Sequence, residues 1–388
     1  MKAPLFSASL LFVWLCLASA AQAATITVTN TVDGQAGSLR NAIANASPGD
    51  TIVFANTLSG QTLDLVEGGL SISKNLTIDA STLAGGLVIS PGGFNQGLGI
   101  TSATVILRSL TLYDGYCFGA GGAISVGTGA TLFANDCSIS SNIAFSGGGG
   151  ICNNGTVTLN NCTLSGNGAV NGSNGGGIVN YGTVTLINCT LSDNVANTGD
   201  GGGILNDGAL SMTNTIVAGN TAYSDADISG AFSGAGNFTN GNPQLAPLGN
   251  YGGPTQTMPP LTGSPVIDAG TDTVTNFLTT DQRGYARWSG AHVDIGAVEV
   301  QFAAVPPNNQ PRIRNAIWFS AGGSNAFQFA FTNVADADFT AFACTNVARP
   351  LANWTVLGNI SEISPGRYQF TDPSATNYPQ RFYRVVSP

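Results

Sequence analysis

The chain has 388 residues and a formal net charge of -9, and only 9% of its residues are charged. With 12 lysines and arginines it lacks the basic surface that follows a phosphate backbone, which argues against nucleic acid as a partner. Its 43% hydrophobic residues argue against disorder, and its 52 glycines are typical of many short strands joined by tight turns.

The first residues have the pattern of a signal peptide. Met1 and Lys2 are followed by an apolar stretch over residues 5–17 and by Ala-Gln-Ala at 21–23, a small-residue cleavage pattern. We therefore expect residues 1–23 to be removed and the mature chain to be exported. No later stretch offers about 20 consecutive apolar residues, so no transmembrane segment is expected after cleavage.

A short helix is predicted within residues 37–45. Leu39 and Ile43 lie four residues apart behind Ser38, which suits an N-cap. This amphipathic helix would cover the first coil of the structure that follows. The next runs alternate as strands do, at residues 50–54, 61–66, 70–73 and 76–79.

The centre of the chain repeats itself. Residues 155–167 and 182–194 are closely similar and lie 27 residues apart. Apolar residues alternate within each unit, which indicates strands, and helix periodicity is absent. Strands that recur in this way pair in parallel only if the chain coils once per repeat. The predicted fold class is therefore all-β, with a right-handed parallel β-helix of 26–27-residue coils over residues 24–241, including the N-terminal cap.

In this register, equivalent residues of successive coils form columns that should face inward. Two columns are apolar, namely Val105, Leu132, Val157, Val184 and Leu210, and Leu112, Ile139, Leu164, Leu191 and Val217. A third column contains Leu110, Cys137, Cys162, Cys189 and Thr215. We interpret its cysteines as small apolar core residues. A disulfide between Cys162 and Cys189 is the alternative, because adjacent coils bring Cα atoms into bonding range.

Asparagines recur at the bends of the coils. One column holds Asn142, Asn167, Asn194 and Asn220, and another holds Asp136, Asn161, Asn188 and Asn214. Asparagine tolerates left-handed backbone and bonds its own backbone, and stacked copies can bond one another. The two columns therefore predict turns and asparagine ladders along the coil.

The pattern changes after residue 241. Residues 242–300 are rich in proline and glycine and lack the core alternation, so we expect an end cap that wraps the far end of the stack. Residues 301–311 have the composition of a linker. Short alternating runs return in residues 312–388 and predict a small β-sandwich.

Three stretches resemble known families. Residues 36–43 and 48–54 resemble the CSLREA-type segment of bacterial secreted β-helix proteins, although Gly37 and Asn41 replace its Cys and Glu. The repeats are similar to polymorphic outer-membrane-protein repeats of the pectin-lyase-like superfamily. The choice-of-anchor Q segment is matched by residues 242–255, 263–270, 280–284 and 293–299. The resemblance implies export to the extracellular space or the outer cell surface of a bacterium.

Residues 353–384 resemble C-terminal modules of large secreted proteins from environmental bacteria. The module stands at the C-terminal position where such β-helix proteins usually carry a sorting signal. The resemblance implies that the module substitutes for an anchor.

Enzymatic chemistry finds little support in the residues. A uronate lyase of this superfamily would need a Lys or Arg base beside carboxylates that hold Ca²⁺, and the coils offer only Lys74 and Arg108. A glycosidase needs two carboxylates, and Asp225 and Asp227 are the only close pair. The coil acids fall mostly singly at bends, at Asp114, Asp136, Asp193, Asp200, Asp207, Asp225 and Asp227.

The richest polar set is Asp281, Arg283, His292, Asp294 and Glu299. We interpret it as structural, with Arg283 paired to Asp281 or Asp294 inside the cap, because buried charges need partners. No catalytic, cofactor-binding or metal-binding residue is assigned, and no cofactor is expected.

The sequence therefore predicts a non-enzymatic secreted or cell-surface scaffold, expected to be a monomer, that contacts an extracellular polysaccharide or a cell-surface partner. The alternative is a carbohydrate-active enzyme, a polysaccharide lyase or glycoside hydrolase, of the pectin-lyase-like class. A third interpretation is a spacer that displays the C-terminal module as the binding part.

Overall fold

A computed structural model of the chain describes residues 23–301 and, further on, 314–321, 324–333, 338–347, 349, 353–364 and 366–386. The chain divides into two compact units, Met1–Phe302 and Ala303–Pro388. Apart from Ala23 and Gln301, the predicted signal peptide and linker lie outside the described residues.

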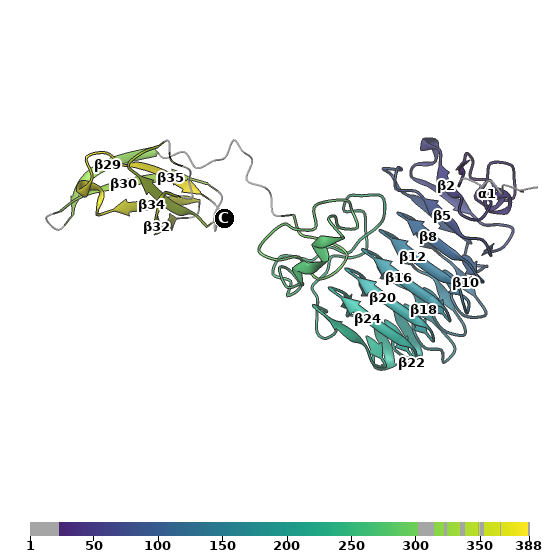
Figure 1. Cartoon of the computed structure of the whole chain (residues 1–388). Coiled ribbons are helices and arrows are strands. Elements are labelled where there is room, and N and C mark those ends of the chain that lie inside the picture. Colours follow the sequence, from purple (N-terminus) through teal and green to yellow (C-terminus); the bar gives the residue numbers. More distant parts are fainter. Residues whose placement is uncertain are drawn as a thin grey trace, which may run out of the picture. The chain divides into compact units, whose positions relative to one another are not determined.

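The first unit is a parallel β-helix, as the repeat predicts. Figure 1 shows its longest sheet, sheet A, as a ladder of strands that lie one above the next. In spatial order, the nine strands of sheet A are β1 (Thr25–Val28), β2 (Thr51–Phe54), β5 (Leu76–Asp79), β8 (Thr104–Arg108), β12 (Thr131–Asn135), β16 (Thr156–Asn160), β20 (Thr183–Ile187), β24 (Ala209–Thr213) and β28 (Ser233–Ala235).

Three further sheets complete the coil, and all their neighbouring strands pair in parallel. Sheet B contains β3 (Gln61–Asp64), β6 (Leu87–Ser90), β9 (Thr111–Tyr113), β13 (Ser138–Ser140), β17 (Thr163–Ser165), β21 (Thr190–Ser192) and β25 (Ile216–Val217). Sheet C contains β4 (Leu70–Ile72), β7 (Leu98–Ile100), β11 (Ile124–Val126), β15 (Ile151–Asn153), β19 (Ile178–Asn180), β23 (Ile204–Asn206) and β27 (Ile228–Ser229). Sheet D contains β10 (Tyr116–Cys117), β14 (Ile143–Ala144), β18 (Gly168–Ala169), β22 (Val195–Asp200) and β26 (Thr221–Ser224).

The register of the sheets is the one that the repeat predicts. Val157 pairs with Val184 in sheet A, and Leu164 pairs with Leu191 in sheet B. All four side chains are fully buried. One core runs the length of the coil, because each inward column continues through every turn.

A cap closes the N-terminal end of the coil. Helix α1 (Leu39–Asn45) starts at Ser38, whose hydroxyl accepts a hydrogen bond from the backbone N–H of Asn41 at 3.2 Å. Its buried Leu39 and Ile43 belong to the coil core. A short 3₁₀ helix, η1 (Asn56–Leu58), follows β2. The helix prediction is therefore confirmed.

The cysteines act as core residues. Cys137, Cys162 and Cys189 are buried in one column, and all six cysteines of the described residues are free thiols. The Cys162–Cys189 disulfide that the sequence left open is not formed. Instead, the Cys162 thiol donates to the carbonyl of Ala134 at 3.4 Å, so the column packs as small apolar groups with weak sulfur hydrogen bonds.

The first asparagine column forms a ladder, as predicted. The side-chain amide of Asn142 donates to Asn167 Oδ1, that of Asn167 to Asn194, and that of Asn194 to Asn220, each at 2.9 Å. Asp227 ends the ladder, because its Oδ1 accepts from the Asn220 amide, also at 2.9 Å. All four asparagines are buried, so each rung satisfies polar groups that water cannot reach.

The second column does not form a continuous ladder. The side-chain amide of Asn161 donates to Asp136 at 3.1 Å, but both polar side-chain atoms of Asn188 are buried without a partner among the described residues. Its members adopt left-handed backbone, with φ of 49° at Asn161 and 50° at Asn188, so the predicted turns are confirmed.

A ladder that the sequence analysis missed lies at the strand ends of sheet C. The Asn153 amide donates to Asn180 Oδ1 at 2.8 Å, and the Asn180 amide to Asn206 Oδ1 at 2.6 Å.

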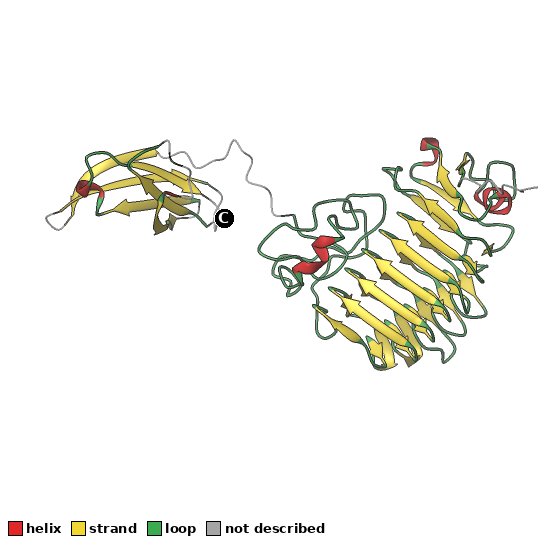
Figure 2. Cartoon of the chain, in the orientation of Figure 1, coloured by secondary structure: helices red, strands yellow, loops and turns green. Residues whose placement is uncertain are grey.

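Residues 242–300 do not wrap the far end of the stack as we expected. The segment is mostly loop around the 3₁₀ helix η2 (Asp272–Asn276), and it lies along the side of the coil (Figure 2). It covers the outer face of sheet B, where Gln282 contacts Thr163 and the hydroxyl of Thr190 accepts from the Ala297 N–H at 3.0 Å. The segment lies over the part of sheet B from β13 to β25, where the outward positions are serine and threonine hydroxyls in β13, β17 and β21 and the apolar Ile216, which packs on the segment, in β25.

The second unit is a small antiparallel structure with two sheets, as predicted. One sheet has the order β29 (Arg314–Ala321), β30 (Ser324–Thr332), β34 (Arg367–Asp372) and β33 (Ser361–Ser364). The other has the order β32 (Thr355–Asn359), β31 (Thr340–Cys344) and β35 (Phe382–Val386), and a 3₁₀ helix, η5 (Ala375–Asn377), precedes β35. Phe329, Phe339 and Tyr368 form its core, and Phe331 stacks on Tyr368 with ring centroids 5.3 Å apart. Its aromatic residues are therefore mainly core residues.

The asparagine ladder should contribute measurably to stability. Replacement Asn194→Ala removes the donor to Asn220 and the acceptor of the Asn167 amide. Buried polar groups of both neighbouring asparagines then lose their partner. We expect the free energy of unfolding in a urea titration to fall by about 3 kcal/mol. The control Asn56→Ala, at an exposed position in η1, should change it by less than about 0.5 kcal/mol. Equal losses in the two variants would contradict the structural role of the ladder.

Candidate functional site

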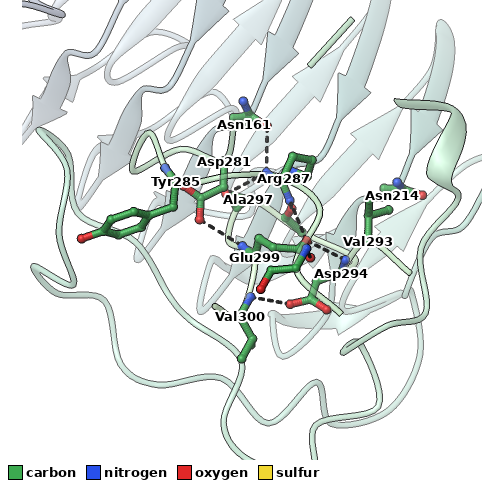
Figure 3. A network of polar contacts seen from close by, with 12 residues as sticks. Asn161, Asn214, Asp281, Tyr285, Arg287, Val293, Asp294, Ala297, Glu299 and Val300 are labelled. Atoms are coloured by element: carbon green, nitrogen blue, oxygen red, sulfur yellow. Dashed lines mark hydrogen bonds and ion pairs between the residues drawn. The ribbon is translucent and has the colours of Figure 1, made fainter. Parts of the chain in front are cut away.

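A buried arginine fastens the 242–300 segment to the coil. Arg287 is fully buried, and its guanidinium donates to Asn161 Oδ1 at 2.9 Å and to the carbonyls of Gly296 and Ala297. In Figure 3 it lies between the coil, represented by Asn161, and the acids of the segment. Its nearest carboxylate is Glu299, at 4.0 Å.

Three buried carboxylates surround this arginine and hold the backbone of the segment (Figure 3). Asp281 accepts from the N–H of Glu299 at 3.1 Å, Asp294 from that of Val300 at 2.6 Å, and Glu299 from that of Asp294 at 2.8 Å. These carboxylates therefore act as backbone acceptors in the interior of the segment. We call Asp281, Arg283, Arg287, Asp294 and Glu299 the anchoring cluster.

The anchoring cluster contains more acids than bases, and burial perturbs their protonation. Burial raises the pKa of Glu299 to about 8. Burial also raises the pKa of Asp294, and it lowers the pKa of Arg287. On the coil side, burial raises the pKa of Asp136 to about 6. These shifts follow from placing charges away from water.

The structure groups four of the five polar residues that the sequence singled out. Arg283 pairs with Asp281 at 2.7 Å, one of the two partners that we predicted. His292 lies apart, exposed, and contacts Asp272 at 2.9 Å. The sequence analysis missed Arg287, because only the folded coil brings it to Asn161, 126 residues away.

The other candidate residues of the coil have structural positions or stand alone. Lys74 donates to the carbonyls of Ala44 and Ala46 at the end of α1. Asp225 and Asp227 do not form a pair, because Asp225 contacts Ser229 and Asp227 ends the asparagine ladder. Of the other coil acids, Asp114, Asp136 and Asp193 occupy left-handed bends, Asp200 contacts Ser224, and Asp207 is exposed.

A groove opens on sheet B where the cover ends. Its floor is the outer face of β3, β6 and β9, and its wall is the stretch 250–256. The wall touches the floor at Gly86, where a Cβ atom would overlap the carbonyl oxygen of Pro254. The volume is about 610 Å³, and the lining residues are Gly60, Thr62, Asp64, Gly85, Gly86, Leu87, Val88, Ser90, Thr111, Tyr113, Asn250, Gly253, Pro254, Thr255 and Gln256.

The groove is polar but weakly charged. Asp64 is its one charged lining residue among those described, and Tyr113, 44% exposed, is its one aromatic lining residue. The other polar positions are hydroxyls and side-chain amides. This surface offers donors and acceptors for a neutral ligand, together with one ring for an apolar face.

A second cavity, the corner pocket, lies at the bend between sheets A and B. Its volume is about 300 Å³, and it is lined by Ser81, Arg108, Ser109, Asn135, Asp136, Asn160, Asn161, Phe277, Leu278, Thr279 and Thr280. The coil forms one side, and the stretch 277–280 of the covering segment forms the other.

Neither a metal centre nor a membrane span is found in the described residues. No group of three or more His, Cys, Asp or Glu side chains among them is placed to hold a metal ion. Within the same residues, no helix has the length and apolar character needed to cross a membrane.

No protein-family model and no curated protein matches the chain. Among solved structures, the crystal structure of pectate lyase Pel9A is similar with a TM-score of 0.30 and 14% sequence identity, over 71% of this chain and 96% of that chain. By its own strand order, the chain is a parallel β-helix protein with a small antiparallel β unit.

Removing the buried cation should destabilise the first unit. Replacement Arg287→Met leaves Asp281, Asp294 and Glu299 without their central cation. We expect the free energy of unfolding to fall by about 3–5 kcal/mol, measured by chemical denaturation. The exposed control Arg108→Gln should change it by less than about 0.5 kcal/mol. An unchanged Arg287→Met variant would show that the cluster does not anchor the segment.

The raised pKa of Glu299 predicts a pH dependence of stability. Folding favours the protonated acid, so this contribution is complete below the ordinary glutamate pKa of 4.5 and is lost as pH rises through about 8. Between about pH 5 and about pH 9, the thermal midpoint of the wild type should therefore fall more than that of Glu299→Gln. Parallel curves for the two proteins would contradict the shift.

Proposed function

We propose that the protein is a non-catalytic, exported β-helix scaffold that binds a neutral glycan in the groove on sheet B. The observation that carries the proposal is the lining of the groove, where hydroxyls and amides surround a single exposed tyrosine. A sugar ring has an apolar face and a rim of hydroxyls, and this lining complements both. The volume of about 610 Å³ lies within the range of small-ligand sites.

The charge of the chain favours a neutral over an acidic glycan. The net charge is -9, and the groove contributes a carboxylate, Asp64, without a basic lining residue among those described. A polyuronate would approach a surface of its own sign. Export is supported by the signal-peptide pattern of residues 1–23.

The distribution of carboxylates supports binding over hydrolysis. A glycosidase holds two carboxylates on either side of the scissile bond, and the lining of the groove supplies only Asp64. The buried acids accept backbone hydrogen bonds inside the anchoring cluster. The second candidate, a carbohydrate-active enzyme, keeps only the support of the resemblance in the repeats.

A binding assay on immobilised polysaccharides tests the proposal. The mature chain, residues 24–388, is applied to a panel of neutral and acidic plant and algal polysaccharides, and Kd is measured for those retained. Replacement Tyr113→Ala should weaken binding about tenfold, equivalent to about 1.4 kcal/mol. The control Tyr223→Ala, an 83% exposed tyrosine in β26 outside the groove, should leave Kd unchanged.

Two outcomes oppose the proposal in different ways. Released reducing ends or unsaturated uronides, with or without Ca²⁺, would establish the enzymatic alternative. Binding that is unaffected by Tyr113→Ala would remove the groove from the site and favour the C-terminal module as the binding part.

A further inference from the structure

On its coil side, the corner pocket has the same two-residue unit on three successive turns of the coil, which we call rungs. Each rung ends its sheet A strand with a polar side chain and then turns through a left-handed residue. The pairs are Arg108–Ser109, Asn135–Asp136 and Asn160–Asn161, with φ of 52°, 56° and 49° at their second residues. Arg108 and Asn160 both pair with Asn135 in register.

The size of this polar patch matches a small ligand. Three rungs span about 10 Å, because adjacent strands lie about 4.8 Å apart. The next rung ends its strand with the apolar Ile187, which is not part of the lining. The patch is therefore limited to the dimensions of a single sugar ring and its hydroxyls.

Several polar groups in the pocket have unused hydrogen-bonding capacity. Asp136 uses only Oδ1, for Asn161, among the described residues. The Asn160 amide donates to Asn135 at 2.9 Å, but Asn160 Oδ1 is buried without a partner in the described part of the chain. The guanidinium of Arg108 is exposed and makes no hydrogen bond or ion pair with any described residue. Buried polar groups of folded proteins are normally paired, so the unpaired Asn160 Oδ1 indicates a site that a ligand completes, and Asp136 and Arg108 have donor and acceptor capacity left for the same ligand.

Arg108 is an isolated basic residue. It is the one lysine or arginine between Lys74 and Arg283. Arg108 and Asp136 line the same pocket from neighbouring turns of the coil. The pocket thus joins one cation, one anion and three amides, and this set suits a neutral ligand with several hydroxyls, each of which can donate and accept.

The other side of the pocket supplies an aromatic ring on a fixed loop. Phe277 lines the pocket and is 62% exposed. Its loop is tied down because the carbonyl of Thr280 accepts from the Asn161 amide at 3.0 Å and that of Thr279 accepts from the Arg287 N–H at 2.9 Å. An exposed ring that faces a polar wall resembles an arrangement in which one face of a sugar stacks while its edge is bonded.

We propose that the corner pocket binds a single neutral sugar unit, with Asp136 and Arg108 bonding neighbouring hydroxyls and Phe277 stacking on the ring. The choice of a sugar rests on the proposed function, but the site is separate from the groove. The two sites differ in the length of glycan that they bind, because the groove accepts an internal stretch of a polysaccharide and the corner pocket accepts a single sugar unit.

Side-chain NMR on the mature protein tests this site directly. Signals of the Arg108 Nε–H and of the Asn135 and Asn160 amide groups are followed while free neutral pentoses and hexoses are added to tens of millimolar. We expect at least one sugar to shift these signals in a saturable way. Amino acids form a second panel, and shifts from them without shifts from any sugar would overturn the proposal.

Variants separate the pocket from the groove. Arg108→Gln and Asp136→Asn should each weaken the sugar affinity about tenfold, since each removes a charge-assisted hydrogen bond. Phe277→Ala should also weaken it, whereas Phe133→Ala, an exposed ring on β12 outside the pocket, should not. Tyr113→Ala should leave sugar binding in the pocket unchanged.

The outcomes distinguish the two proposals. Polysaccharide binding that depends on Tyr113, without any sugar-induced shift at Arg108, would overturn the pocket and leave the groove. Saturable shifts of the Asn135 and Asn160 amide signals that need about tenfold more sugar in Arg108→Gln and Asp136→Asn would support the pocket even if no polysaccharide is retained by the groove.

Discussion

The parallel pairing of each coil on the next is the constraint on which the rest of the first unit depends. Register partners in sheet A lie 25 to 27 residues apart from β8 to β24, and the spacing is 29 residues from β5 to β8 and 22 from β24 to β28. When the turns stack in register, each residue of one turn contacts the equivalent residues of the turns above and below it. Apolar residues then become continuous columns, and asparagines become ladders that would be costly as isolated buried amides.

The same constraint places the surface features. The outward positions of sheet B are hydroxyls from β13 to β21 and include Ile216 in β25, and the 242–300 segment covers this part of the sheet. Where the cover stops, the uncovered strands become the floor of the groove. The corner pocket arises in the same way, because one kind of bend repeated on three rungs aligns its polar side chains.

The sequence predicts the coil well and the covering segment poorly, for one physical reason. Partners such as Val157 and Val184 are separated by a fixed period, so their contact is visible as a repeat. The contacts of the segment have no period: Gln282 reaches Thr163 across 119 residues, and Arg287 reaches Asn161 across 126. Sequence patterns indicate that Arg283 and Asp281 pair, since they are neighbours, but not which face of the coil receives them. The groove and the pocket have walls from this segment, so neither could be assigned from the sequence.

Methyl NOEs in a protein of residues 24–388 test the stacked coil most directly. With labelled leucine and valine methyl groups, the structure predicts strong NOEs from Leu164 to Leu191 and from Val157 to Val184, which are register partners buried in one core. Absence of both NOEs, with the same methyl groups in contact with other residues instead, would contradict the coil and with it every surface derived from it.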